Sequence, residues 1–377
     1  MINTALYIHI PFCDHKCIYC DFYSIITSDN VDNFLKALKT EIDYYAKIYS
    51  TERIITSLFF GGGTPSMMSA EYIDEIVRYS KQKFEFNENA EITLETNPGT
   101  VNKEKLSAFR NYGINRISIG VQSFDDDDLK FLTRIHDKQT AISTVYNAVD
   151  AGFENISIDL IFNLPGQTKE KWEENLKQAV SLPIKHISAY SLILERGTIL
   201  NKLVLDGKVK IQDEDYDAEL YELTIEFLNN RGFFQYEVSN FAKPGYECIH
   251  NIAYWHHQDY IGLGPSAHSF IQNKRWWNYS SLKKYISEVE LKQNAMMNFE
   301  TLDYNQLQDE YIMLALRSDG IKLNEYINRF GSEWLDKHSK DFEIMKEQNL
   351  IEIKHNTIKL TPKGYAVCDE IYFFKLE

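Results

Sequence analysis

An apolar strand pattern runs directly into a cysteine-rich loop in residues 7–22, YIHIPFCDHKCIYCDF. The cysteines of this stretch are Cys13, Cys17 and Cys20, with the spacing C-x3-C-x2-C. Iron–sulfur cubanes are held by cysteine thiolates, usually about four of them. Three thiolates on one loop would hold three irons and leave the remaining iron open to another ligand. We therefore expect these cysteines to bind a [4Fe-4S] cluster with an open coordination position.

Zinc is the main alternative ligand for this loop. A closed structural zinc site takes about four protein ligands, and His9 or His15 would have to complete the set. A chance cluster is a weak explanation, because the chain has 5 cysteines in all. The other two, Cys248 and Cys368, lie far apart, so the pattern is not the disulfide framework of a secreted protein. An oxygen-sensitive cluster needs a reducing compartment, and we expect a cytoplasmic protein.

Composition narrows the range of partners. The chain has 377 residues and a formal net charge of −15, and a field of that sign repels nucleic acids and anionic membranes. Residues 1–4 carry no basic segment of a signal peptide, and no window is long and apolar enough to span a membrane. The sequence therefore predicts no nucleic-acid partner and no integral membrane segment.

Strand and helix patterns alternate through the first 230 residues. Strands are expected at 5–10, 56–60, 91–96, 115–122, 155–162 and 185–194. Helices are expected at 31–48, 69–84 (with Ser69 as N-cap), 102–112, 138–151, 168–181 and 212–230. Consecutive βα units imply a parallel sheet with right-handed crossovers. The predicted fold is α/β, an open six-stranded (β/α)6 partial TIM barrel, with a smaller, mainly helical, winged-helix-like C-terminal domain.

The domain organisation follows from changes in composition. Residues 1–232 form the expected barrel core, 233–300 an aromatic and histidine-rich segment, and 301–377 the C-terminal domain, with a short hairpin near 351–360. A short acidic run at 125–128 is expected to be a solvated loop that begins a helix.

Further polar groups and glycines fall at strand ends, on the side of the sheet where the cysteine loop lies. Gly62, Gly63 and Thr64 follow the second strand, and glycine lets backbone approach a ligand closely. Taken singly, each of the other polar residues at these strand ends is more often a structural hydrogen-bonding residue than a ligand contact. Together they surround one mouth of the barrel, where active sites of barrel folds lie. They are Glu95, Gln122, Arg134 and Asp159.

The cysteine spacing, with an aromatic residue before the last cysteine, resembles the radical S-adenosylmethionine (SAM) superfamily. In that superfamily, SAM chelates the open iron of a [4Fe-4S] cluster. Segments 7–20, 59–66, 115–124, 134–137, 159–168 and 236–270 are similar to the branch that contains oxygen-independent coproporphyrinogen III oxidase and the HemW-type heme chaperones. The SAM contacts that this resemblance implies are Tyr7, Gly62, Gly63, Thr64, Glu95, Gln122, Arg134 and Asp159.

Two features distinguish the relatives within this branch. The oxidase carries a further cysteine where this chain has Phe22, and the heme chaperones carry an H-N-x-x-Y-W segment that matches HNIAYW at 250–255. The resemblance therefore favours a heme chaperone. It implies heme as the ligand, a heme-acceptor protein as the partner and a homodimer as one form of the protein. Coproporphyrinogen III oxidase activity is the alternative, so whether the chain is an enzyme stays open.

His250 is the first candidate for the heme ligand. A neutral imidazole is a common axial ligand of heme iron, and histidines and large aromatic residues are dense around it. The alternative for His250 is a buried hydrogen-bonding role. His268 and Cys248 are the second and third candidates.

Overall fold

Parallel strands form the centre of the molecule and follow one another in chain order across the sheet. They are β1 (Ile2–Ile10), β2 (Arg53–Gly62), β3 (Glu85–Thr96), β4 (Arg116–Gln122), β5 (Asn155–Phe162) and β6 (His186–Ser191). The computed structural model describes residues 1–27, 29–368 and 371. All six strands predicted from the sequence are present, and the open α/β partial barrel is confirmed.

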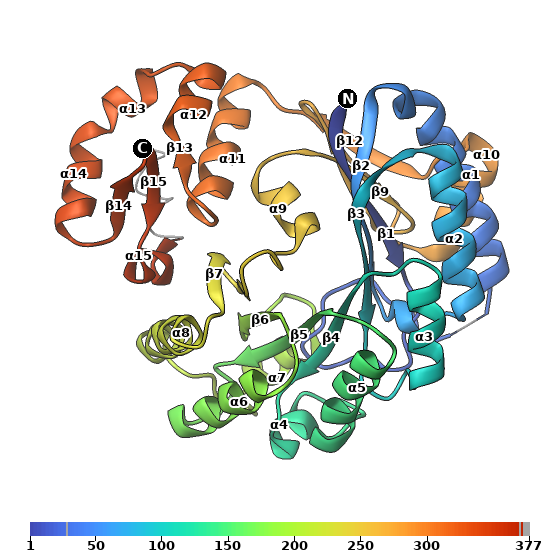
Figure 1. The fold of residues 1–377 in the computed structure, drawn as a ribbon, viewed down its shortest axis with the longest axis horizontal. Coiled ribbons are helices and arrows are strands. Elements are labelled where there is room, and N and C mark those ends of the chain that lie inside the picture. The colour runs from blue at the N-terminus through green and yellow to red at the C-terminus, as the bar shows by residue number, and fades with distance from the viewer. Residues whose placement is uncertain (28, 369–370, 372–377) are drawn as a thin grey trace.

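Helices cover the outer side of these strands (Figure 1). They are α1 (Val31–Tyr49), α2 (Ala70–Lys83), α3 (Lys103–Asn111), α4 (Asp126–Phe131), α5 (Lys138–Asp150), α6 (Lys169–Ser181), α7 (Ile199–Leu205) and α8 (Glu214–Asn229). Short 3-10 turns lie at η1 (Ser50–Glu52) and η2 (Pro65–Met67). The Ser69 side chain accepts from the Tyr72 amide and caps α2, as the sequence predicts. The sequence indicated only the start of α4, at the acidic run 125–128, and did not predict α7.

The sheet extends beyond the barrel strands at both edges, which the sequence did not indicate. At one edge lie β8 (Asn240–Ala242) and β7 (Phe234–Glu237). At the other lie β9 (Asp259–Leu263), β10 (His268–Ile271), β11 (Lys274–Asn278) and β12 (Met296–Thr301). These strands are 3 to 6 residues long, too short for a recognisable alternation. Across the described residues, the sheet has 12 strands in a linear order that does not close.

A single crossing of the chain joins the two edges of the barrel. After β8, next to β6, the chain passes through α9 (Ile249–Trp255) and reaches β9, which pairs parallel with β1. In Figure 1, α9 lies on the opposite side of β1–β3 from α1 and α2. His250 on α9 is hydrogen-bonded to Ser57 of β2, so the crossing packs against the inner side of the barrel strands.

The C-terminal part forms its own small core. It contains α11 (Tyr304–Leu316), β13 (Ile321–Lys322), α12 (Leu323–Phe330), α13 (Glu333–Lys337), α14 (Ser339–Glu347), β14 (Ile351–Lys354), β15 (Thr357–Leu360) and α15 (Pro362–Ala366). The β14–β15 hairpin and β13 form one small sheet, as expected for the predicted helices and hairpin.

The boundaries of the three ranges, 1–232, 233–300 and 301–377, stay a proposal, and residues 372–377 lie outside the described part of the chain. One large hydrophobic cluster contains residues from both of the first two ranges, such as Phe60 and Trp276. Helix α10 (Leu282–Lys292) of the second range packs against α1.

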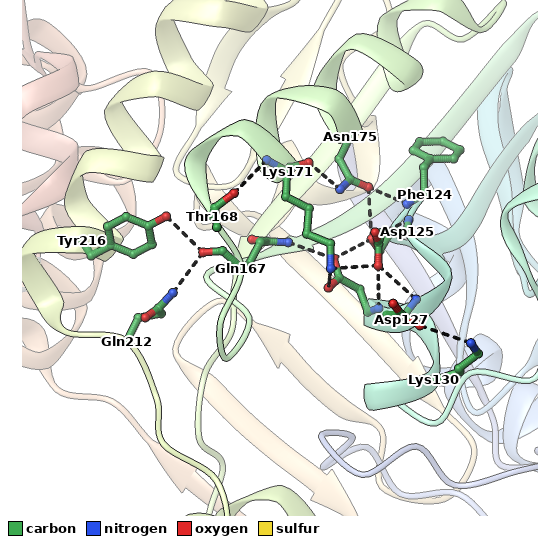
Figure 2. Close-up of polar contacts among 12 residues, drawn as sticks. Phe124, Asp125, Asp127, Lys130, Gln167, Thr168, Lys171, Asn175, Gln212 and Tyr216 are labelled. Carbon is green, nitrogen blue, oxygen red and sulfur yellow. Dashed lines mark hydrogen bonds and ion pairs between the residues drawn. The ribbon is translucent and has the colours of Figure 1, made fainter.

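The acidic run at 125–128 begins a helix, as predicted, but it is not fully solvated. Asp125 caps α4, and Lys171 of α6 lies 2.9 Å from Asp125 and 2.8 Å from the buried Asp128 (Figure 2). Gln167 also donates to Asp128, and its own carbonyl accepts from Tyr216. These bonds join the loops that follow β4 and β5, so they fix two of the strand ends that surround the candidate site.

Candidate functional site

A cavity of about 390 Å³ lies where the cysteine loop meets the carboxyl ends of the barrel strands. The predicted residues that line it are Cys13, Cys17, Cys20, Gly62, Gly63, Thr64, Glu95, Gln122, Arg134 and Asp159. The fold therefore brings together every predicted cluster and SAM residue except Tyr7.

The cysteines are free thiols on one wall of this cavity, and all three are partly exposed. Cys13 Sγ lies 3.2 Å from the Thr64 hydroxyl, and an Arg134 guanidinium nitrogen lies 3.6 Å from Cys17 Sγ. Within the described residues, no three His, Cys, Asp or Glu side chains are grouped to hold a single metal ion. A cubane instead bonds each thiolate to its own iron, and three free thiols beside open space fit that demand.

The glycine run shapes the cysteine loop. A Cβ atom on Gly62, whose φ is +109°, would fall 2.6 Å from the His9 ring, and one on Gly63 would fall 2.6 Å from the Phe12 carbonyl oxygen. The close approach allows the Gly63 amide to donate to the Ile10 carbonyl at 2.8 Å. Only glycine permits this contact, so the run holds the backbone that leads into the cysteines.

Two carboxyl groups face the cavity from β3 and β5. The pKa of Glu95 is raised to about 8, by burial first and by the nearby Asp159 second. Burial also raises the pKa of Asp159, which accepts from the Ser118 hydroxyl at 3.2 Å. The Gly62 amide donates to Glu95 at 3.2 Å. Glu95 is therefore mainly protonated at neutral pH, a property that strand position alone does not reveal.

Arg134 is fixed by residues that the sequence analysis did not single out. Its guanidinium donates to Asn97 Oδ1 at 2.8 Å and to the Gly120 carbonyl at 2.9 Å. Asn97 in turn donates to the Thr64 hydroxyl at 2.9 Å, so it joins two predicted site residues. Its position two residues after Glu95, just beyond a strand end, was the available signal. Tyr190 at the end of β6 also lines the cavity and was missed.

Gln122 has an unusual backbone. Its φ is +68°, and the pairing of β4 with β5 shifts register between Ile119 and Gln122. A left-handed backbone is uncommon for a residue with a side chain and marks a functional or structural constraint. Here the irregularity ends β4 at the cavity wall.

A second cavity of about 440 Å³ adjoins the cysteine loop on the side of β1 and β9. Tyr7 lines this cavity, not the first, although it lies beside Glu95. Asp21 and Phe22 line both cavities. Most of the remaining wall comes from the segment 254–275, including Tyr254, Tyr260 and His268.

His250 lies behind the second cavity. It is 2% exposed, and its ring nitrogens lie 2.9 Å from the Ser57 hydroxyl and 3.0 Å from the Tyr254 hydroxyl. Its ring stacks on Phe59 at 4.9 Å, and burial lowers its pKa to about 3, so the imidazole is neutral. Tyr254, its hydrogen-bond partner, lines the cavity. Ligation of iron by His250 stays a prediction and requires the loss of one of these two bonds.

The other two candidate heme ligands have opposite surroundings. Cys248 is fully buried and lies 3.4 Å from a Glu91 carboxylate oxygen, and burial raises the pKa of its thiol to about 12. His268 is exposed and lines the second cavity.

The fold and the three-cysteine loop define a radical SAM protein. The sequence profile of the Radical SAM superfamily matches residues 7–179. The structure is similar to coproporphyrinogen III oxidase (HemN) from Escherichia coli, a radical SAM enzyme, with a TM-score of 0.84 and 24% identity, covering 99% of this chain and 90% of that one. This likeness establishes the fold.

Sequence similarity identifies the family within that class. The heme chaperone HemW of Bacillus subtilis (strain 168) is 34% identical over 375 residues, which cover 98% of each chain. The heme chaperone HemW of Lactococcus lactis subsp. lactis is 32% identical, covering 98% of this chain and 96% of that one. The chain belongs to the HemW family of radical SAM proteins. Membership of the superfamily implies a [4Fe-4S] cluster and SAM.

Proposed function

We propose that this protein is a heme chaperone, which binds heme and transfers it to an acceptor protein. The observation that carries the proposal is the similarity, over 98% of both chains, to a relative named as a heme chaperone. Phe22 supports it, because the oxidase of this branch has a further cysteine at that position. The acceptor protein, a homodimeric assembly and a cytoplasmic location belong to the same proposal. Within the described residues, no helix is long and apolar enough to cross a membrane.

The first cavity is the proposed site of the cluster and SAM. Cys13, Cys17 and Cys20 would bind the cluster, which supplies one-electron chemistry when it is present. The proposed SAM contacts are Tyr7, Gly62, Gly63, Thr64, Glu95, Gln122, Arg134 and Asp159. Arg134 is fixed by Asn97 and the Gly120 carbonyl, so its guanidinium is pre-oriented for a carboxylate. Asn97 links this guanidinium to the Thr64 hydroxyl, and the Thr64 amide donates to the Phe12 carbonyl directly before the cysteine loop.

From the sequence, we propose that heme binding depends on His250. The structure offers a physical reason that does not require a bond to iron. His250 holds the hydroxyl of Tyr254, and Tyr254 forms part of the second cavity. Loss of the His250 imidazole would release the Tyr254 ring and leave a space behind it.

The test is a heme titration of the anaerobically reconstituted protein, with and without SAM, followed by transfer to an apo-globin as a probe acceptor. We expect saturable binding near one heme per chain and transfer to the globin. A parallel anaerobic assay supplies coproporphyrinogen III, SAM and a reductant. Saturable binding with no turnover supports the chaperone, whereas turnover without stable heme binding supports the oxidase.

A further inference from the structure

We propose that heme occupies the second cavity and that His268 is an axial ligand of its iron. This inference rests on the proposed heme chaperone function and assigns the place of the ligand. Three observations carry it: the composition of the cavity wall, the availability of one imidazole, and the position of the cavity beside the cysteine loop.

The wall of the second cavity suits a flat apolar macrocycle. Six of its lining residues are Tyr or Phe, and Tyr254 and Tyr260 meet edge to face with ring centroids 4.5 Å apart. Phe270 and Tyr23 continue the aromatic lining. Cofactor sites are concave, mainly apolar and aromatic, with volumes of roughly 300–1,000 Å³. The cavity volume of about 440 Å³ falls in this range, and an open cavity leaves one edge of the ligand in solvent.

The histidines around the cavity differ in whether a ring nitrogen is available. His9 contacts the Tyr7 hydroxyl at 3.2 Å with one nitrogen and the Tyr23 carbonyl at 2.9 Å with the other. His257 lies between Arg329, at 3.2 Å, and Glu310, at 3.4 Å. His250, behind the wall, is also bonded at both nitrogens. His9 and His250 are thus bonded at both ring nitrogens, whereas His257 is hydrogen-bonded through Nδ1 only, and its buried Nε2 faces Glu310 without a hydrogen bond among the described residues.

His268 is different. It is exposed at the start of β10, and its ring nitrogens form no hydrogen bond within the described part of the chain. Its ring stacks on Trp277 of the paired strand β11, with centroids 5.9 Å apart. Partial burial of the ring, and after it Arg275, lower the pKa of His268, which favours its neutral form. A neutral imidazole with a free lone pair is the form that ligates iron.

Arg275, the cationic side chain of the cavity wall, is already paired with carboxylates, which leaves heme binding to the aromatic wall and the imidazole. Arg275 pairs with Glu310 and, at 3.1 Å, with Glu300. Glu310 also faces His257. Asp21, on the shared wall, is exposed. The heme carboxylates would therefore lie at the open edge.

The two cavities share Asp21 and Phe22 of the cysteine loop. Phe22 is 62% exposed and is the second residue after Cys20, the last cysteine of the cluster motif. A heme in the second cavity would thus lie against Phe22, with the cluster cavity on the other side.

The test compares the heme spectra and affinities of the full-length wild type, His268→Ala, His250→Ala and His355→Asn. His268→Ala should shift the Soret band, weaken heme binding about tenfold or more, and recover the wild-type spectrum when free imidazole is added. His250→Ala should weaken binding and leave the Soret band in place, because it moves Tyr254 and not the ligand. His355→Asn removes an exposed imidazole on the distant β14–β15 turn, at a φ of +48° that Asn tolerates, and should match the wild type.

The outcomes separate this inference from the proposed function. If the wild type binds heme and His268→Ala keeps both its spectrum and its affinity, His268 is not the ligand and only this inference fails. If His250→Ala alone changes the Soret band, the iron ligand is His250. If the wild type does not bind heme, the proposed function fails and this inference falls with it.

Discussion

At the scale of residues, SAM binding in the first cavity should depend on the protonation state of Glu95. Its pKa is raised to about 8, and the neighbouring Asp159 contributes to that shift. SAM carries a sulfonium charge, and a bound cation near these carboxyls would favour their ionised forms. Binding of SAM would then release a proton, so SAM affinity should increase as the pH rises.

We expect the SAM affinity of the wild type to rise between pH 6 and pH 8, by up to about tenfold per pH unit, and then to level off. Glu95→Gln should bind SAM more weakly and show a flatter pH dependence. Anaerobic calorimetry in buffers of different ionisation enthalpy measures both the affinity and the released proton. Glu104→Gln, on the exposed face of α3, is the control and should follow the wild type. An unaltered slope in Glu95→Gln would show that another group releases the proton.

The cysteines give a second residue-scale prediction. Cys17→Ser should lose most of its iron and sulfide, from about four irons per chain to below about one, because a serine is a poor ligand for the cluster and leaves two thiolates. Iron and sulfide analysis after anaerobic reconstitution measures this. Cys368→Ser, in the C-terminal core, should keep the wild-type content. A zinc ion in place of iron and sulfide in the wild type would contradict the cluster.

The positions of site residues could be predicted where the signal is local. The cysteines lie on one loop, and the strand-end residues share one end of a parallel sheet, so the first cavity followed from the sequence. Tyr7 shows the limit of that reasoning. It lies on β1, which the sequence predicts as a strand, but the cavity it faces is built by residues of α9 and β9, some 250 positions away. Which cavity a strand face opens to depends on those distant pairings.

At the scale of elements, the outer helices could be predicted from local sequence patterns, whereas the edge strands could not. The predicted outer helices have 9 to 19 residues, enough for the helical period to repeat. The strands β7 to β12 are too short to show alternation, and β9 pairs parallel with β1 across most of the chain. Their positions are set by tertiary pairing, which a single sequence does not display.

Glu41 on α1 joins elements from both parts of the large core. Its carboxyl accepts from the Gly264 amide at 2.8 Å, from Asn278 at 2.7 Å and from the Tyr285 hydroxyl at 2.7 Å. The side chain is fully buried, and burial raises its pKa to about 7. These bonds connect α1 to the end of β9, to β11 and to α10.

Glu41→Ala should lower the free energy of unfolding by about 3 kcal/mol, because it leaves three buried donors without an acceptor. A folded-state pKa above the unfolded value means that the contribution of Glu41 is complete below about pH 4.5 and declines as the pH rises to about 7. The deficit of the variant should therefore be larger at pH 5 than at pH 8. Chemical denaturation followed by circular dichroism measures it. Glu290→Ala, on the exposed face of α10, should change stability by less than about 0.5 kcal/mol. Equal deficits at both pH values would mean that Glu41 stays ionised in the folded protein.

At the scale of the whole molecule, the crossing through α9 is the feature that distinguishes this architecture from a simple row of βα units. It carries the chain from the β6 edge to the β1 edge, and its own residues back the second cavity. The wall of that cavity comes from the start of the chain, from the segment after α9, and from α11 of the C-terminal part. A heme site there would depend on residues from all three ranges, 1–232, 233–300 and 301–377, so no single sequence motif could predict it.

Leu314 on α11 tests this dependence, because it lines the second cavity and not the first. Leu314→Trp should place an indole in the cavity and weaken heme binding about tenfold or more, while SAM affinity and iron content stay at wild-type values. Ile344→Trp adds the same side chain at a 52% exposed position on α14 and should leave all three properties unchanged. Parallel heme and SAM titrations of the reconstituted variants, with thermal unfolding to confirm folding, supply the comparison. Full heme affinity in a folded Leu314→Trp protein would place the heme outside the second cavity, whereas a joint loss of heme and SAM would show that the C-terminal part supports the whole site and not one cavity.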